Sequence, residues 1–176
     1  MLKNRILSLF TVLLLVTGCA TSVTKDISVD SDADSKTNFS AYKSYAWLGS
    51  ATIVYDDTGK WEPPNFDADA EVKFLIDREL RKRGMVEDSI NPDMIVIFAA
   101  GVDMDAMQYK VDPQSDIDLL ENIPLGALSV VLVDAETEIV IWAGLATAEI
   151  QQDPSSEVVK KRLDYAVTEM IKELPR

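Results

Sequence analysis

The chain has 176 residues, room for about one ordinary domain, and its 47% hydrophobic and 27% charged content excludes a disordered or collagen-like chain. Its 30 acidic residues against 17 basic ones give a formal charge of −13, which excludes nucleic acid as an expected partner. With no histidine and one cysteine, the chain cannot form a Ser-His-Asp triad, a Cys-His dyad, a histidine-ligated metal site or an internal disulfide, so we expect no enzyme and no cofactor.

Residues 1–18 have the pattern of a secretory signal peptide. Lys3 and Arg5 precede an apolar run from residue 6 to residue 16, which is shorter than the roughly 20 residues a membrane-spanning helix needs. Removal of this leader takes away two basic residues and leaves 15 against 30 acidic ones. We therefore expect residues 1–18 to be removed and the mature chain to carry a formal charge of −15.

The only cysteine follows this leader directly, in Val16-Thr17-Gly18-Cys19. This sequence resembles the lipobox of bacterial lipoproteins, which implies cleavage after Gly18 and acylation of Cys19. The alternative is an ordinary signal peptide with a chance cysteine. Because Ala20 rather than Asp follows the cysteine, the resemblance implies anchoring at the periplasmic side of the outer membrane, with the inner membrane as the alternative.

The mature chain begins with polar residues and two expected strands. Residues 19–38 hold the acylated cysteine, a tether rich in Ser, Thr and Asp, and an alternating segment at 22–30 that predicts the first strand. A second strand is expected at 44–48. Residues 49–65 contain turn-forming Asp, Gly and Pro residues and predict a loop.

Residues 67–83 predict the first helix. Apolar residues recur at helical spacing, acidic residues stand at the beginning, basic residues stand at the end, and Gly84 follows as a stop. Three strands are then expected at 93–103, 125–134 and 137–149, the last two forming a hairpin across 134–136.

A second helix is expected to open at Asp153-Pro154, with Asp153 as its N-cap, and to end at Pro175. Residues 106–124, between the third and fourth strands, are expected to form a long acidic loop. The order strand-strand-helix-strand-strand-strand-helix predicts one α+β domain over 39–176, joined by the strand at 22–30. Its sheet should be mostly antiparallel, with two helices packed against one face.

The expected central strands are apolar on both sides, unlike an antiparallel sheet with one wet face. The side chain of Val131 should point to the opposite side of the sheet from that of Leu132. The alternation of the next strand puts Val140 and Trp142 on one side. Two helices cover one face, so the other must be covered by the loops at 49–66 and 106–124, by a second subunit, by a protein partner or by a ligand. Val131, Val140 and Trp142 mark this candidate binding face.

Two acidic motifs are weaker candidates. Asp30, Asp32 and Asp34 have the spacing of the first ligands in a calcium loop, but Ser35 and Ala41 stand where Gly and Glu are required, so a solvated acidic turn is expected. Asp103 and Asp105 could pair as acid and base only in an apolar cleft. Their surroundings in the sequence are polar, which disfavours catalysis.

An aromatic cluster from Phe39 to Trp47 is expected to pack in the core at the sheet edge. Asp32-x-Asp34 with Phe39-x-x-Tyr42-Lys43-Ser44-Tyr45-x-Trp47 resembles a bacterial envelope lipoprotein family, the domain-of-unknown-function 4136 family (DUF4136). Later segments of the chain resemble the same family in the same order. They are Ile76-Asp77-x-x-Leu80-x-x-Arg83-Gly84, Leu132-Val133-Asp134-Ala135-x-Thr137, Trp142-x-Gly144, and Ala166-Val167 with Leu174-Pro175. Ala143 departs from the resemblance, and the family implies no catalytic site.

These observations favour a lipoprotein anchored at Cys19 that acts as a protein-interaction or accessory module. Its expected partners are the membrane, through the acyl chains, and an envelope protein. A carrier of a small molecule or lipid, with a pocket between sheet and loops, is the alternative, and a carboxylate-based hydrolase is a remote one.

Overall fold

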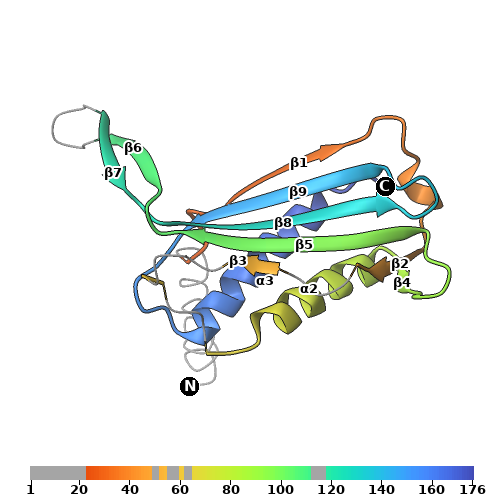
Figure 1. The fold of residues 1–176 in the computed structure, drawn as a ribbon, viewed down its shortest axis with the longest axis horizontal. Coiled ribbons are helices and arrows are strands. Elements are labelled where there is room, and N and C mark those ends of the chain that lie inside the picture. The colour runs from red at the N-terminus through yellow and green to blue at the C-terminus, as the bar shows by residue number, and fades with distance from the viewer. Residues whose placement is uncertain (1–22, 49–51, 55–59, 62–64, 112–117) are drawn as a thin grey trace, which may run out of the picture.

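The computed structural model describes residues 23–48, 52–54, 60–61, 65–111 and 118–176. Its main sheet has the strand order β1-β9-β8-β5-β2-β4. The short strand β3 also pairs with β5, further along that strand than β2 does. The two helices lie together on one face of this sheet (Figure 1). The predicted α+β fold, with a mostly antiparallel sheet and two helices on one face, is confirmed.

The three long strands, which are apolar on both sides, lie next to one another in the sheet. They are β5 (Met94–Asp103), β8 (Leu125–Asp134) and β9 (Val140–Glu149), and they run antiparallel to one another. The ranges expected for β5 and β8 agree with those observed to within one residue. The strand β9 begins three residues later than expected, because residues 135–139 connect it to β8.

The first strand, β1 (Ser28–Ala33), pairs antiparallel with β9 at the sheet edge. It lies later than the segment expected at 22–30, since residues 23–26 form a turn. The expected solvated turn at Asp30, Asp32 and Asp34 is wrong in part, because Asp30 and Asp32 belong to this strand. The shift follows from pairing with β9, a contact that the local sequence does not encode.

Three short strands extend the other edge in parallel pairs. They are β2 (Ser44–Trp47), β3 (Thr52–Val54) and β4 (Val86–Glu87). The strand β2 was predicted, whereas β3 falls inside the expected loop at 49–65. The strands β3 and β4 are too short to show an alternating pattern of apolar and polar residues. They form strands because they pair with β5 and β2.

The expected loop at 106–124 also contains strands. The strands β6 (Met107–Val111) and β7 (Asp118–Asn122) pair antiparallel in a separate two-stranded sheet. This hairpin projects from one end of the main sheet (Figure 1).

The first helix, α2 (Ala68–Lys82), has the ends that the sequence predicts. The Asp67 carboxylate accepts a hydrogen bond from the Ala70 N–H, and Arg83 is the C-cap. Gly84 follows at φ +82°, a left-handed conformation that glycine adopts without a Cβ penalty. Its apolar stripe is fully buried against the sheet and the second helix.

The second helix, α3 (Ser156–Lys172), begins later than expected. Ser155 is its N-cap and accepts from the Val158 N–H at 3.3 Å, so the predicted N-cap Asp153 is wrong. Asp153 has φ +47°, outside the geometry of a helix N-cap. Over the described residues, neither helix is long and apolar enough to cross a membrane.

Candidate functional site

The sheet has one face without helices, which we call the open face. Register places seven outward-pointing apolar residues of β5, β8 and β9 on it: Ile95, Ile97, Val131, Val133, Val140, Ala143 and Leu145. Val140 is 53% exposed and Leu145 44% exposed, while the others shield one another and are half-buried. The open face is therefore an apolar surface in contact with solvent, unlike the polar outer face of an ordinary antiparallel sheet.

Val131 and Val140 lie on the open face, but Trp142 does not. A register irregularity between Leu132 and Val133 pairs Val140 with Val133, while Trp142 pairs with Leu132 on the helix side. The extra residue of such a bulge reverses the alternation along β9. The prediction that Trp142 shares a face with Val131 and Val140 is therefore wrong, and Trp142 is 1% exposed in the core.

The two loops expected to cover the open face adopt other positions in their described parts. The strand β3 continues the sheet in its own plane by pairing with β5, and the β6–β7 hairpin extends away from its end (Figure 1). The exposure of Val140 and Leu145 agrees with this arrangement. Among the described residues, the open face has no covering layer.

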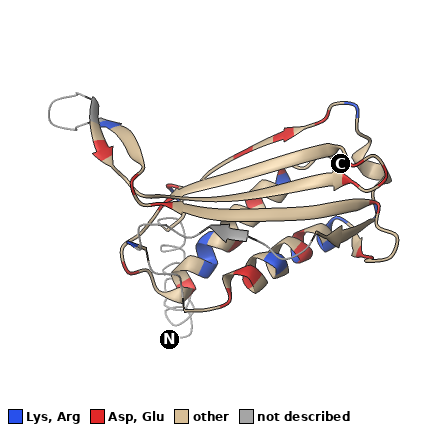
Figure 2. Cartoon of the chain, in the orientation of Figure 1, with Lys and Arg blue, Asp and Glu red and all other residues tan. Residues whose placement is uncertain are grey.

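Charges border the open face without crossing it (Figure 2). Asp30 and Asp32 stand on β1 beside Leu145 and Ala143 respectively, and both carboxylates are exposed. Acidic residues on an edge strand also discourage pairing with another sheet. A surface that fits this face would be apolar in its middle and basic at this edge.

A cleft of about 970 Å³ lies on the other face, at the end where both helices begin. Side chains that point toward the helices become smaller toward this end of the sheet. Val96, Leu132 and Trp142 form a fully buried row, whereas the row of Val102, Gly126 and Ala148 lines the cleft. Small residues leave the space that large ones fill elsewhere between sheet and helices.

One wall of the cleft is fixed by a salt bridge between distant parts of the chain. The Arg162 guanidinium donates from Nη1 and Nη2 to the two oxygens of Asp26, at 2.8 and 2.5 Å. It also donates to the carbonyls of Val23 and Glu149. The hydrogen bond with Arg162 holds the pKa of Asp26 below its ordinary value, although burial opposes this. No local pattern in the sequence indicated this pair.

The predicted core packing of the aromatic cluster is confirmed. Tyr45 is fully buried, and Trp47 packs edge-on against Tyr45 and Phe98 with ring centroids 6.3 and 5.8 Å apart. The Asp77 carboxylate accepts from the Tyr45 hydroxyl at 2.8 Å and from the Trp47 indole at 3.2 Å. Hydrogen bonds to α2 thus satisfy the polar atoms of this cluster, and we assign it a structural role.

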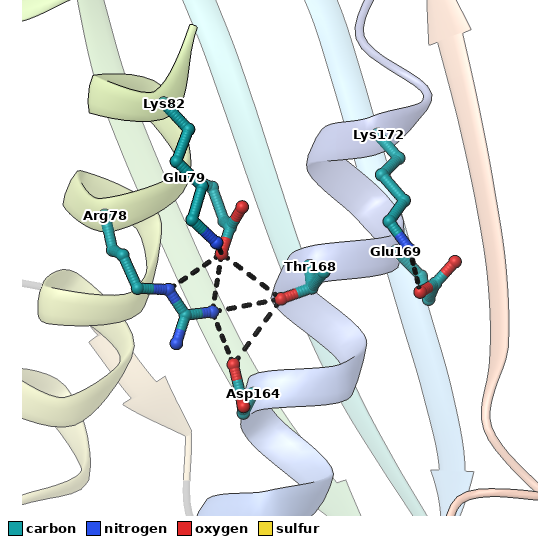
Figure 3. A network of polar contacts seen from close by, with 7 residues as sticks. All are labelled: Arg78, Glu79, Lys82, Asp164, Thr168, Glu169 and Lys172. Atoms are coloured by element: carbon teal, nitrogen blue, oxygen red, sulfur yellow. Dashed lines mark hydrogen bonds and ion pairs between the residues drawn. The ribbon is translucent and has the colours of Figure 1, made fainter.

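A network of charged side chains joins the two helices (Figure 3). The Glu79 carboxylate accepts from Arg78 Nε at 2.7 Å and from Lys82 Nζ at 2.8 Å, while Arg78 also contacts Asp164 and Thr168 on α3. Burial alone would raise the pKa of Glu79, but the hydrogen bonds from Lys82 and Arg78 outweigh it and leave this pKa lowered. Every drawn carboxylate has a cationic partner, which is typical of helix packing and not of acid–base chemistry.

Asp103 and Asp105 are both exposed at the end of β5. The Asp105 carboxylate accepts from Lys60 Nζ at 2.5 Å, and Asp103 accepts from the Asp105 N–H at 2.9 Å. These exposed carboxylates do not lie in the apolar cleft that a catalytic carboxylate pair requires. Gly18 and Cys19, the predicted cleavage and acylation residues, lie outside the described residues.

Tyr42 and Asp134 form a hydrogen bond that gives stability a pH dependence. Burial and this bond raise the pKa of Tyr42 to about 12, and the 2.6 Å bond from Tyr42 with those from Thr137 lowers the pKa of Asp134 to about 2. We expect Tyr42→Phe to lower the free energy of unfolding at pH 7 by about 2 kcal/mol, as for a hydrogen bond to a charged group. Chemical denaturation measures this difference.

The direction in which this stability difference changes with pH follows from the lowered pKa of Asp134. Its ordinary value is 3.8, so the contribution is complete above about pH 4 and is lost as the pH falls toward about 2. The difference between wild type and Tyr42→Phe should shrink over that range. Tyr109→Phe, at a tyrosine that is 78% exposed, is the control and should change nothing. A pH-independent difference would exclude the assigned role of the Asp134 charge.

Comparisons with other proteins find relatives by family and by fold. A model of the family described as domain of unknown function (DUF4136) matches residues 29–176. A DUF4136 family protein from Bacteroides thetaiotaomicron has a TM-score of 0.53 at 9% identity, over 82% of this chain and 95% of that one. No curated protein matches.

Two further solved structures are similar. A PDZ domain protein from Parabacteroides distasonis has a TM-score of 0.52 at 13% identity over 89% of this chain, which spans 39% of that protein. A minor lipoprotein from Acinetobacter baumannii has a TM-score of 0.37 at 10% identity, over 76% of this chain and 93% of that one. At TM-scores of 0.52 and 0.53 the first two likenesses show the fold of the domain.

Proposed function

The chain belongs to the DUF4136 family, and on this premise we propose that it is a non-enzymatic envelope lipoprotein that binds another envelope protein through its open face. Cys19 is the proposed acylation site and Gly18 the residue before the cleavage. Ala20 favours the periplasmic side of the outer membrane. Three acyl chains anchor a protein far more firmly than the marginal attachment given by one.

The observation that carries this function is the uncovered apolar surface of the open face. Val140 at the start of β9 and Leu145 further along it are about half exposed, and the residues of β5 and β8 that lie beside them carry no charge. A contiguous apolar patch on a soluble domain marks an interaction surface, because leaving it in water is unfavourable. Asp30 and Asp32 at its border favour a partner with basic residues at the matching edge.

The absence of catalysis is part of the same proposal. The chain has no histidine, and its candidate acid–base pair, Asp103 and Asp105, is exposed and hydrogen-bonded. The groups with lowered pKa values, such as Glu79 and Asp26, are held by ion pairs that fix the fold. These features support a binding protein over the remote hydrolase alternative.

Photo-crosslinking in the living envelope tests the open face. A photoreactive phenylalanine analogue at Leu145 should capture one protein, whereas the same analogue at Ile90, 84% exposed in a loop, should not. The double variant Val131→Lys, Val140→Lys should abolish the capture at Leu145. The measurement is the mass-shifted adduct and the identity of the captured protein.

Thermal melting of the same double variant provides the control for folding. Because the open face is in contact with solvent, we expect the two lysines to leave the melting temperature close to that of Ile90→Lys. Unfolding of the double variant would show that other parts of this chain cover the face. Equal capture from Leu145 and Ile90 would argue against a specific partner.

The alternative function, a carrier of a small molecule or lipid, is favoured by a different observation. The 970 Å³ cleft is at the upper end of the roughly 300–1,000 Å³ range of ligand pockets. It lies between the sheet and the helix N-termini, and Lys60, Trp61, Asn65 and Pro124 of the two expected loops also line it, as the sequence suggested.

A further inference from the structure

The cleft at the beginning of α2 and α3 has predominantly apolar walls. Ala100 and Leu128 from the sheet face Val72 of α2 and Leu163 of α3 across it. Apolar walls on several sides of such a cleft bind an apolar group, because its transfer from water is favourable in proportion to the buried area. We propose that the cleft binds an acyl chain of a membrane phospholipid.

The charges around the cleft argue against a small anionic ligand. The Arg162 guanidinium is neutralised by Asp26, and Lys60 forms an ion pair with Asp105. Glu149 and Asp153 add acidic groups to the lining. A ligand held through its own negative charge has no uncompensated cation among these residues, whereas an uncharged hydrocarbon chain needs none.

The position of the cleft along the chain selects a membrane source. The Val23 carbonyl accepts from Arg162, and Ile27 lines the cleft, so the described chain begins at its wall. Only four residue steps separate Val23 from Cys19, a reach of at most about 14 Å. This step rests on the proposed acylation of Cys19, because the acylated residue lies at the membrane surface. The cleft is then held beside the lipid headgroups.

The charge of the domain also distinguishes a membrane lipid from a free fatty acid. A mature chain with 30 acidic and 15 basic residues repels carboxylates that approach from solution. A zwitterionic phospholipid in the supporting membrane experiences no net repulsion of this kind. The acyl chain therefore enters from the bilayer next to the anchor.

Photolabelling from within a membrane tests the proposal. The full mature protein is reconstituted in vesicles of phosphatidylethanolamine and phosphatidylglycerol that include phosphatidylethanolamine with a diazirine at the end of one acyl chain. After irradiation, mass spectrometry should place the adducts on peptides that line the cleft. Ala100→Phe should reduce this labelling about tenfold, because a phenylalanine ring excludes several methylenes from the cleft.

Ala99→Phe is the matched control. Ala99 is the neighbouring residue on β5, points to the opposite face of the sheet, and is half-buried. Its labelling should equal that of wild type. Should Ala100→Phe melt at a lower temperature than wild type, Ala148→Leu fills the same cleft with a smaller side chain and should also reduce the labelling. Labelling that Ala100→Phe and Ala148→Leu leave unchanged would overturn the acyl-chain site.

The same digest separates this inference from the proposed anchor. An acylated Cys19 peptide without adducts in the cleft would overturn the acyl-chain site and leave the anchor intact. An unacylated Cys19 peptide together with cleft adducts would overturn the anchor and support the acyl-chain site. Adducts confined to the open face would also overturn the cleft assignment.

Discussion

Replacing Trp142 with alanine is expected to lower the free energy of unfolding by about 3–5 kcal/mol, the cost typical of removing a buried tryptophan. Its side chain is 1% exposed and pairs across the sheet with Leu132. The ring occupies the space next to Gly144, where an added Cβ would lie 2.4 Å from Trp142 Cη2 and 2.5 Å from Met170 Cγ. Helix α3 therefore packs directly on this ring, and denaturant titration measures the loss.

Two variants control this prediction. Val140→Ala, on the same strand but 53% exposed on the open face, should change the free energy of unfolding by less than about 1 kcal/mol. Trp142→Phe should cost much less than Trp142→Ala, because Trp142 Nε1 has no hydrogen-bond partner among the described residues and most of the ring volume is kept. A Trp142→Ala variant as stable as Val140→Ala would contradict the position of Trp142 in the core.

Replacing Cys19 with alanine is expected to abolish incorporation of labelled fatty acid and to remove the protein from outer-membrane fractions. The reason is chemical, because the only thiol of the chain is lost and no other residue can form the thioether. Hydrocarbon burial contributes roughly 0.8 kcal/mol per methylene, so the change affects nearly all of the attachment. Metabolic labelling followed by density-gradient separation of the membranes measures both effects.

Two neighbouring positions sharpen the test of the anchor. Thr21→Ala leaves the Val16–Cys19 sequence unchanged and should label and fractionate as wild type does. Ala20→Asp should keep the label but move the protein to the inner membrane, as the lipobox resemblance implies. Equal labelling of Cys19→Ala and wild type would contradict acylation at Cys19.

The two faces of the sheet would give the domain two separate contacts in the envelope. The open face is suited to a protein because it is apolar and bordered by carboxylates on β1. The cleft is suited to a hydrocarbon chain because its walls, formed by sheet and helices, are mostly apolar and lie close to the beginning of the described chain. The Val131→Lys, Val140→Lys variant and the Ala100→Phe variant separate these contacts experimentally.

Local patterns were sufficient for the long elements. The N-cap, the charged ends and the glycine stop of helix α2 all lie within one stretch of the sequence. The strands β5 and β8 consist mostly of apolar residues. Sequence patterns did not predict the elements that form only by pairing with another strand. The short strand β3 and the hairpin β6–β7 lie in segments expected to be loops, because hydrogen bonds to a neighbouring strand stabilise them.

The candidate binding face was predicted in part for the same reason. Strict alternation puts Val140 and Trp142 on one side, but the bulge opposite Leu132 and Val133 moves Trp142 into the core. An added residue in one strand is defined only against its partner strand. The cleft likewise depends on rows of small residues aligned across β5, β8 and β9, and on the contact between Asp26 and Arg162.

The sequence by itself therefore determined the family, the α+β class, the two helices and the proposed anchor at Cys19, since each depends on neighbouring residues or on composition. Only the tertiary structure decided that Trp142 is a core residue, that the open face has no covering layer in the described chain, and that a cleft lies beside residues 23–27. Register, strand pairing and side-chain volume between layers are relations between distant segments. Their free energies arise only when those segments meet.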